Sequence, residues 1–299
     1  KTGIRTRRIA GPEEFSSDLA IGAGRALFEQ QALAPADIEY LIVCTQSPDF
    51  FLPSTACIVQ DALGLPLSAG ATDITLGCSG YIYAIGLAKG LIESGQVRNV
   101  LVITADTYTK FLNPLDKSVR TIFGDGASAT LVLDDGDSES IRGITYGTNG
   151  AGAKSLVVPH GGLRRGEDIQ PLAAAEARGL VEADYDLYMD GPAIFNFTLE
   201  VVPAAIESIL TRAGVAFEDI DLFVFHQANA FMLEHLRKKL GIPVEKFVVE
   251  MADVGNTVSS TIPIALTEVE RKGQLQAGMT VMLVGFGVGL SWGGLIVRW

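Results

Sequence analysis

One pattern of segments occurs twice in this sequence, in the same order. The segment from Ala36 to Thr45 resembles the segment from Glu218 to His226: each passes through Asp-Ile into a short apolar run. Each copy continues through a helix that ends in Leu-Gly-aliphatic, and then through a Gly-Gln pair that precedes a second apolar run. A repeat of this length predicts two copies of one folding unit.

The spacing within the two copies supports a duplication. The Gly-Gln pairs begin at Gly95 and Gly273, which are 178 residues apart (273 − 95), and Cys78 and Asn256 have the same separation (256 − 78). The repeat therefore places Cys78 and Asn256 at equivalent positions, each just ahead of a predicted helix.

The apolar runs, such as 40–45 and 222–225, are short and lack polar alternation, which is typical of strands buried on both faces. Predicted helices alternate with them, and this order favours an α/β protein. We predict an N-terminal half over 1–135, a turn-rich connecting or cap region over 136–190, and a C-terminal half over 191–299.

Composition excludes several classes of protein. The formal net charge of −12 argues against general binding to nucleic acid or to an anionic membrane. No uninterrupted apolar run reaches the roughly 20 residues of a membrane span, and no signal peptide is visible. The three cysteines (Cys44, Cys57, Cys78) and three histidines fit neither a disulfide framework nor a metal site. We therefore expect a reduced, cytoplasmic protein without a bound metal.

Cys78 is the candidate nucleophile. It lies between a strand-like segment and an apolar helix, flanked by Gly77 and Gly80. Unpaired N–H groups and the helix dipole at such a position favour the thiolate, which is the reactive form of cysteine. Cys44, within a strand, and Cys57, within a helix, are interpreted as packing residues.

Two polar residues are candidates to act with Cys78. His226 ends a buried strand, where open α/β sheets place their ligands. Asn256 would by itself be interpreted as a cap or turn residue, but its equivalence to Cys78 favours a functional role. The run from Gly285 to Gly294 lacks room for the helix and second strand of a dinucleotide site, so we interpret it as an oxyanion loop.

Together these segments resemble the β-ketoacyl-acyl-carrier-protein synthase III family, whose members are condensing enzymes of the thiolase fold. The similarity runs in order along the whole chain, in the segments Thr2-Gly-Ile-Arg-Thr-Arg-Arg-Ile, Asp73-Ile-Thr-Leu-Gly-Cys-Ser-Gly, Phe123-Gly-Asp-Gly-Ala, His226-Gln-Ala-Asn, Gly255-Asn-Thr and Gly285-Phe-Gly-Val-Gly-Leu-Ser-Trp-Gly. The resemblance implies two pseudo-repeated halves in αβαβα layers. The family pattern begins earlier than Lys1, so about one strand and one helix are expected ahead of it.

The resemblance also implies the reaction. Cys78 would carry an acyl group taken from acyl-CoA, and a malonyl thioester on carrier protein or CoA would lose carbon dioxide and attack it, giving a β-ketoacyl product for fatty-acid or specialised-metabolite biosynthesis. The Nε2–H of His226 and the amide of Asn256 would stabilise the enolate. Backbone N–H groups of Cys78 and of the turn at Gly287 and Val288 would form the oxyanion hole. No cofactor is expected.

Further assignments follow from the same resemblance. The family implies a homodimer. The expected substrate contacts are Leu52, Met189, Asn229 and Phe286. The expected carrier-protein contacts are Arg237, Lys238 and Lys239, although these three also fit a solvated helix face.

Three alternatives remain at this stage. An acyltransferase of the same family would move the acyl group to an alcohol or amine, but would not need Asn256. A thiolase-like or hydroxymethylglutaryl-CoA synthase-like enzyme would need a further acid or cysteine as base, and Gly285–Gly289 contains no cysteine. A non-catalytic scaffold would not need the set of Cys78, His226 and Asn256.

Overall fold

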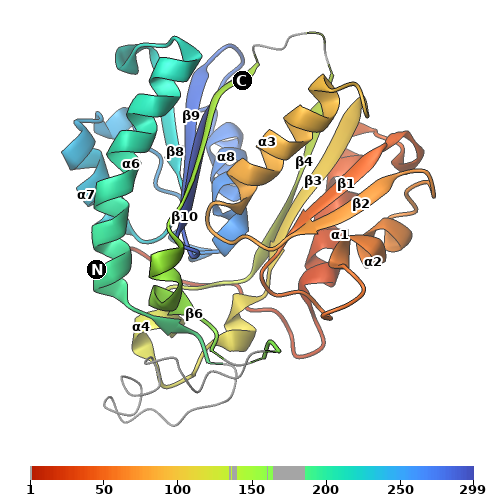
Figure 1. Cartoon of the computed structure of the whole chain (residues 1–299), viewed down its shortest axis with the longest axis horizontal. Coiled ribbons are helices and arrows are strands. Elements are labelled where there is room, and N and C mark those ends of the chain that lie inside the picture. The colour runs from red at the N-terminus through yellow and green to blue at the C-terminus, as the bar shows by residue number, and fades with distance from the viewer. Residues whose placement is uncertain (1, 135, 137–139, 160, 164–185) are drawn as a thin grey trace.

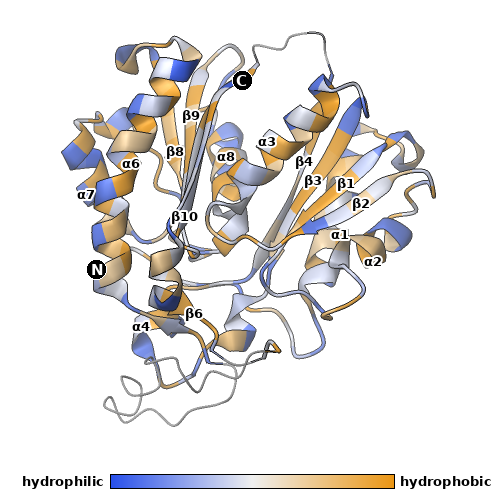
Figure 2. Ribbon diagram, viewed as in Figure 1, coloured by the Kyte–Doolittle hydropathy of each residue, from blue (hydrophilic) through white to orange (hydrophobic). Residues whose placement is uncertain are grey.

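The computed structural model describes residues 2–134, 136, 140–159, 161–163 and 186–299. The chain forms two four-stranded sheets, with helices between them and on their outer sides (Figure 1). Figure 2 shows apolar stretches in strands of both sheets.

The first sheet has the strand order β2-β1-β3-β4. β1 (Tyr40–Cys44), β2 (Gly70–Ile74) and β3 (Asn99–Asp106) are parallel, and β4 (Gly126–Leu133) runs antiparallel to β3. β1 and β3 are buried over nearly their whole length, as predicted for strands covered by helices on both faces.

The second sheet has the strand order β5-β10-β9-β8. β8 (Leu222–Phe225) and β9 (Thr280–Gly287) are parallel, while β10 (Ser291–Arg298) runs antiparallel to β9 and to the edge strand β5 (Ile141–Thr148). The series β8-β9-β10 repeats the series β1-β3-β4 of the first sheet, so the predicted duplication is confirmed.

β5 corrects the predicted connecting region. Residues 141–148 pair along β10 and belong to the second sheet, whereas 136–190 was assigned as a whole to a connection or cap. Polar residues and glycines interrupt this edge strand, which hid it among the turns around it. Within the same region, β6 (Leu156–Val157) pairs with β7 (Tyr188–Met189). Residues 137–139, 160 and 164–185 lie outside the described residues, so the rest of the cap stays a prediction.

The helices complete five layers. α3 (Gly80–Glu93) and α8 (Thr261–Arg271) lie between the sheets and contact both. α1 (Ser16–Gln31) and α2 (Thr55–Ala62) cover the outer side of the first sheet, and α6 (Gly191–Ala213) and α7 (Ala230–Leu240) that of the second (Figure 1). The predicted αβαβα order is thus confirmed. Shorter helical turns are found at 35–37, 108–111, 117–120 (α4), 150–155, 217–219, 244–246 and 258–260.

One helix has the length and composition of a membrane span, although Asn196, Glu200 and Glu207 interrupt its apolar residues. α6 has 23 residues and is apolar enough to cross a bilayer. It packs against β5, β9 and β10, and residues such as Phe197, Val202 and Ile209 are buried there. We therefore interpret α6 as a core helix, since such helices share the composition of membrane spans.

A stability prediction follows from the contact between α3 and β1. A methyl group on Gly80 would lie 2.3 Å from the Sγ atom of Cys44, whose side chain is fully buried. We expect Gly80→Ala to lower the free energy of unfolding by about 1–3 kcal/mol in denaturant titrations. Because the clash is with sulfur, adding Cys44→Ala should recover part of that loss. Gly90→Ala is the matched control in the same helix, since its methyl would meet nothing within 4 Å; equal stability of the two single variants would contradict this account.

Candidate active site

Cys78 lies between the end of β2 and the start of α3, and its side chain is only 5% exposed. The turn is closed by a hydrogen bond from the N–H of Gly80 to the carbonyl of Gly77, 2.7 Å long. A methyl group on Gly77 would lie 2.4 Å from Oε1 of Gln46 and 2.8 Å from Cγ1 of Val288. The glycine therefore lets the turn that carries Cys78 approach both neighbours.

The turn between β9 and β10 brings the second half of the chain to Cys78. A methyl group on Gly287 would lie 2.8 Å from Cys78 Sγ, so only glycine allows this approach. The backbone N–H groups of Val288 and of Cys78 itself donate to the sulfur. Two donors that converge there can also stabilise the oxyanion of a tetrahedral intermediate. The N–H groups of Cys78 and Val288 are thus placed as expected for an oxyanion hole. Gly287 contributes by letting the turn between β9 and β10 approach the sulfur.

The sulfur is protonated at neutral pH. Burial raises the pKa of the Cys78 thiol to about 12, although the two backbone hydrogen bonds lower it. Cys78 immediately precedes Ser79, the N-cap residue of α3, so the expectation that the start of this helix favours the thiolate stays a prediction. Attack of Cys78 on a thioester consequently requires a base.

His226 follows β8 directly and its side chain is 2% exposed. Burial lowers the pKa of its imidazole to about 3, so the ring is neutral at physiological pH. Nδ1 lies 2.7 Å from Oγ1 of Thr261, and the ring of Phe286 stands at 87° to the imidazole with centroids 5.6 Å apart. These contacts on two sides hold the ring in one orientation.

Asn256 lies in the loop ahead of α8, with Nδ2 3.5 Å from Nε2 of His226. Its Oδ1 accepts a hydrogen bond of 2.9 Å from the N–H of Val258, which turns the NH2 group toward the imidazole. Its backbone N–H donates to Ile122 and its carbonyl accepts from the N–H of Gly124, each at 2.9 Å. The amide is thus fixed in both orientation and position.

These backbone contacts give the segment Phe123-Gly-Asp-Gly a role that the sequence analysis missed. In the sequence analysis it served only as one of the segments that carry the family resemblance. A methyl group on Gly124 would lie 2.3 Å from the carbonyl of Val254, so the loop around Asn256 can approach only a glycine. Asp125 accepts from the N–H groups of Ala10 and Thr109 at 2.8 and 2.9 Å. The glycines on either side of Asp125 were the signal in the sequence that another segment packs closely against this one.

The three predicted catalytic residues line one cavity of about 160 Å³. Its walls combine the turn after β2, the end of β8 and the loop before α8, so both halves contribute. Three of the residues predicted to contact substrate also line it: Met189, Asn229 and Phe286. The side chain of Asn229 in addition caps α7 by accepting from the N–H of Met232 at 2.9 Å.

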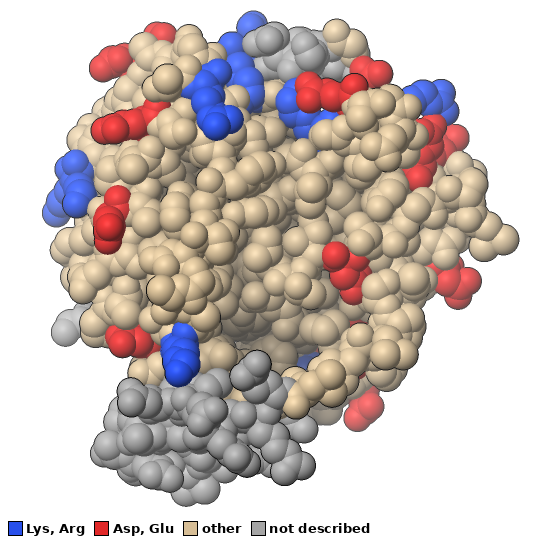
Figure 3. All heavy atoms as spheres, in the orientation of Figure 1, with Lys and Arg blue, Asp and Glu red and all other residues tan. Residues whose placement is uncertain are grey.

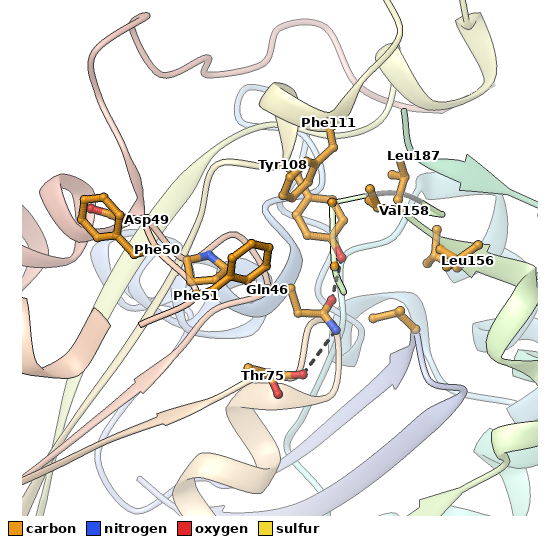
Figure 4. Close-up of a pocket in the computed structure, with 15 residues that line it drawn as sticks. Gln46, Asp49, Phe50, Phe51, Thr75, Tyr108, Phe111, Leu156, Val158 and Leu187 are labelled. Atoms are coloured by element: carbon orange, nitrogen blue, oxygen red, sulfur yellow. Dashed lines mark hydrogen bonds between the residues drawn. The ribbon is translucent and has the colours of Figure 1, made fainter. Parts of the chain in front are cut away.

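A second cavity of about 690 Å³ lies beside the first and shares Leu156 with it. Val288, whose N–H points at Cys78, lines this second cavity. In Figure 4 the side chains of Tyr108 and Gln46 point toward one another: the phenol donates to Oε1 at 2.6 Å, and Nε2 donates to the carbonyl of Thr75 at 3.4 Å. This polar pair lies in a wall that is otherwise mostly apolar.

The remaining predicted contacts are not brought to either cavity within this chain. Leu52 is 82% exposed and lines neither cavity. On α7, Glu234 pairs with Arg237 at 2.8 Å and with Lys238 at 3.2 Å, and Lys239 is exposed. The docking role of these cations stays a prediction.

The face seen in Figure 3 is hollowed between the two halves, and most of the charged side chains in that view lie around the hollow rather than in it. Among the described residues, no group of three or more His, Cys, Asp or Glu is placed to hold a metal ion.

Comparison with known proteins agrees with this geometry. Residues 72–150 match the family model for 3-oxoacyl-[acyl-carrier-protein (ACP)] synthase III, and 210–299 match the model for its C-terminal part. The β-ketoacyl-[acyl-carrier-protein] synthase III of Caldanaerobacter subterraneus subsp. tengcongensis is 39% identical over all of this chain and 88% of its own length.

Solved structures give the same result. A crystal structure of a 3-oxoacyl-(acyl-carrier-protein) synthase III superposes with a TM-score of 0.94 at 51% identity, over 100% of this chain and 89% of the other. The priming β-ketosynthase of the R1128 polyketide pathway superposes with a TM-score of 0.86 at 31% identity, over 99% and 85% of the two chains. With the duplicated thiolase-like fold and the site between its halves, these findings show that the chain belongs to the 3-oxoacyl-[acyl-carrier-protein] synthase III family of condensing enzymes.

Proposed function

We propose that Cys78, His226 and Asn256 carry out the reaction of this family, the decarboxylative condensation of an acyl-CoA with a malonyl thioester on acyl carrier protein. The observation that carries the proposal is that a thiol, an imidazole and an amide from both halves of the chain line one cavity. Because the acyl group passes from CoA to Cys78 and then to the malonyl carbon, the enzyme is classed as an acyltransferase.

In the first half-reaction, Cys78 Sγ attacks the carbonyl carbon of the acyl thioester and gives up its proton to a base. The N–H groups of Val288 and Cys78 stabilise the oxyanion, and its collapse expels CoA as a thiolate. His226 is the neutral base that lines the same cavity.

In the second half-reaction, the malonyl group loses carbon dioxide and the electron pair of the broken C–C bond forms an enolate. His226 Nε2 and Asn256 Nδ2 lie 3.5 Å apart in the cavity that Cys78 also lines, and as N–H donors they are suited to stabilise the enolate oxygen. The carbanion attacks the acyl carbonyl, and Cys78 leaves as a thiolate and regains a proton. These steps use the chain's own groups, so we propose that no metal or redox cofactor takes part.

Intact-protein mass spectrometry tests this function. The protein is incubated with acyl-CoA thioesters and then with malonyl carrier protein. A mass gain that disappears in the second step, with formation of a β-ketoacyl product, supports condensation. An acyl group that survives the malonyl thioester but leaves to an alcohol or amine would contradict it and would show simple acyl transfer, which does not require the amide of Asn256.

We propose that the acyl chain occupies the larger cavity of Figure 4. The cavity of about 160 Å³ can hold the reacting thioester but not a long acyl chain, whereas the cavity of about 690 Å³ begins at Val288 and is lined by Phe111, Leu156 and Leu187. Apolar walls favour an unsubstituted hydrocarbon chain over a charged one.

The pair formed by Tyr108 and Gln46 is expected to limit the length of that chain. Tyr108→Phe removes the hydroxyl that holds the Gln46 amide in the wall. One hydrogen bond contributes about 0.5–1.5 kcal/mol, so acylation should shift roughly 2- to 10-fold toward longer chains. Competition between acetyl-CoA and longer acyl-CoAs, read by intact mass, measures the shift. Tyr146→Phe is the control, because Tyr146 lies outside the cavity; the same preference in both variants would be incompatible with a limiting role.

We propose a soluble, cytoplasmic homodimer. Phe50, Phe51 and Leu52 are 60%, 79% and 82% exposed beside the larger cavity, and such an apolar group supports an interface with a second copy. In that arrangement Leu52 would close the partner's cavity. The exposed cations of α7, Lys238 and Lys239, would meet an acidic carrier protein, with Arg237 beside them. The formal net charge of −12 supports neither nucleic acid nor membrane as a partner.

A further inference from the structure

Two buried serines connect the turn that carries Cys78 to the turn between β9 and β10. Ser79 follows Cys78 and is fully buried, and Ser291, the first residue of β10, is 2% exposed. Their Oγ atoms lie 2.7 Å apart, although 212 residues separate them in the sequence. Ser291 Oγ also donates to the carbonyl of Val288 at 2.7 Å. Buried hydroxyl groups therefore join the two halves of the chain next to the nucleophile.

The direction of these hydrogen bonds follows from the hydrogens available. A serine hydroxyl has one hydrogen to donate and lone pairs to accept with. Ser291 uses its hydrogen on the carbonyl of Val288, so in the contact between the serines it accepts and Ser79 donates. The series thus runs from the Ser79 hydroxyl to the Ser291 hydroxyl and on to the Val288 carbonyl, and hydrogen bonds in such a series strengthen one another.

Glycines allow the two turns to come this close. A methyl group on Gly285 would lie 2.8 Å from the carbonyl oxygen of Cys78, and one on Gly287 would lie 2.8 Å from its Sγ. Gly289 has a φ of 140°, in the region that favours glycine, and a methyl group there would lie 3.1 Å from Ser291 Oγ. The glycines give room for the approach, and the serine pair holds the two turns together across it.

Each of these turns carries one donor of the proposed oxyanion hole. The N–H of Cys78 comes from one turn and the N–H of Val288 from the other. The serine pair links the two turns, because it begins at the residue after Cys78 and ends at the carbonyl of Val288. Leu290 exchanges two backbone hydrogen bonds with Asn149, at 2.8 and 3.0 Å, so the second turn is held on its other side as well.

We propose that Ser291, oriented by Ser79, is a positioning residue that aligns the oxyanion hole by fixing Val288 relative to Cys78. The inference rests on the function proposed above and adds what holds its two backbone donors in place. An oxyanion hole is effective when its donors are aimed in advance at the atom on which charge develops. Neither serine lines the catalytic cavity or the larger one, so both act through Val288 and do not touch the substrate.

The carbonyl group of the acyl-enzyme reports on the oxyanion hole directly. The whole protein is acylated with an acyl-CoA labelled with ¹³C at the carbonyl, and the infrared difference from the unlabelled form isolates the thioester band on Cys78. Hydrogen bonds to the carbonyl oxygen lower its stretching frequency, so Ser291→Ala should move the band to higher frequency. Because this variant loosens a donor without removing it, acylation and condensation should each slow by roughly 10- to 100-fold, less than for loss of a whole donor.

Three further variants distinguish positioning from a general loss of packing. Ser79→Ala keeps the bond from Ser291 to Val288 and removes one hydrogen bond of the series, so the band should move in the same direction by less, with roughly 2- to 10-fold slowing. Ser291→Thr keeps the hydroxyl and should restore both the band and the rate. Ser16→Ala is the matched control, because Ser16 is also fully buried and its hydroxyl lies 2.8 and 3.1 Å from two other hydroxyls within the first half. It should leave the band and the rate unaltered.

The outcomes separate the two proposals. A normal rate in Ser291→Ala, or a slower rate with an unmoved carbonyl band, would overturn the role of the serine pair while leaving the condensing function in place. If Ser291→Ala does not fold, Ser79→Ala decides, and an unmoved band in that variant would overturn the proposal equally. An unaltered protein that forms no acyl-enzyme on Cys78 with any acyl-CoA would overturn the proposed function, and the role of Val288 as an oxyanion donor with it.

Discussion

Replacing Cys78 with alanine should abolish the acyl-enzyme and lower the condensation rate by roughly 10³-fold or more. The physical reason is that Cys78 Sγ is the one atom to which the two oxyanion donors, from Val288 and Cys78, converge. The N–H groups remain in the alanine variant, but no nucleophile is left for them to assist. The measurement is intact mass after incubation with acyl-CoA, followed by the yield of β-ketoacyl product.

Cys57 provides the matched control for this variant. It is exposed on α2 and not a packing residue as interpreted from the sequence, whereas Cys78 is buried. Cys57 is therefore the cysteine that non-specific acylation would reach first. Cys57→Ala should keep both the acyl-enzyme and the product. A mass gain that persists in Cys78→Ala and is lost in Cys57→Ala would identify the acylation as adventitious, and the assignment of Cys78 as nucleophile would have to be withdrawn.

Replacing Asn256 with alanine should separate the two half-reactions. Acylation of Cys78 does not use the amide, so the acyl-enzyme should form at a rate close to that of the unaltered protein. Condensation should slow by about 10²–10³-fold, which is the usual cost of removing one donor from a developing oxyanion. The acyl-enzyme should therefore accumulate when malonyl carrier protein is added, and carbon dioxide release should slow to the same extent as product formation.

The acylation rate of Asn256→Ala also reports whether this variant is correctly folded. Asn256 Oδ1 also accepts from the N–H of Val258, and loss of that bond could disturb the loop. An unchanged acylation rate shows that the Cys78 side of the cavity is intact. Asn196→Ala removes an amide from an exposed position on α6 and should leave both half-reactions unaltered with malonyl-CoA as the extender. Equal slowing of acylation and condensation in Asn256→Ala would show a structural defect and would remove Asn256 from the proposed chemistry.

Much of the fold was predictable because its signals are local and occur twice. Helices at 16–31, 55–62, 80–93, 191–213, 230–240 and 261–271 alternate with the buried strands, as predicted. Apolar runs that are buried on both faces made β1, β3, β8 and β9 recognisable. β5 was missed because an edge strand has only one neighbour and can carry polar residues and glycines. β6 and β7, at two residues each, are too short to produce a periodic pattern.

The residues of the candidate site also differ in how far the sequence could predict them. Cys78, His226 and Asn256 could be proposed because each follows a recognisable element and because the duplication relates the first to the third. Two other features could not be predicted: the contact of Thr261 with His226, and the backbone contact of Ile122 with Asn256. Both depend on segments that are far apart in the sequence.

The sequence by itself determined the α/β class, the two halves, the positions of most elements and the three residues that carry the proposed chemistry, because these depend on local periodicity and on a pattern repeated along the chain. Only the tertiary structure decided how deeply the reacting groups are buried. Burial raises the pKa of the Cys78 thiol and lowers that of the His226 imidazole, and these shifts arise from the surrounding packing rather than from sequence neighbours. The contact of Thr261 with His226 and the division of the site into two cavities depend on the same packing, since they join segments that are far apart in the sequence.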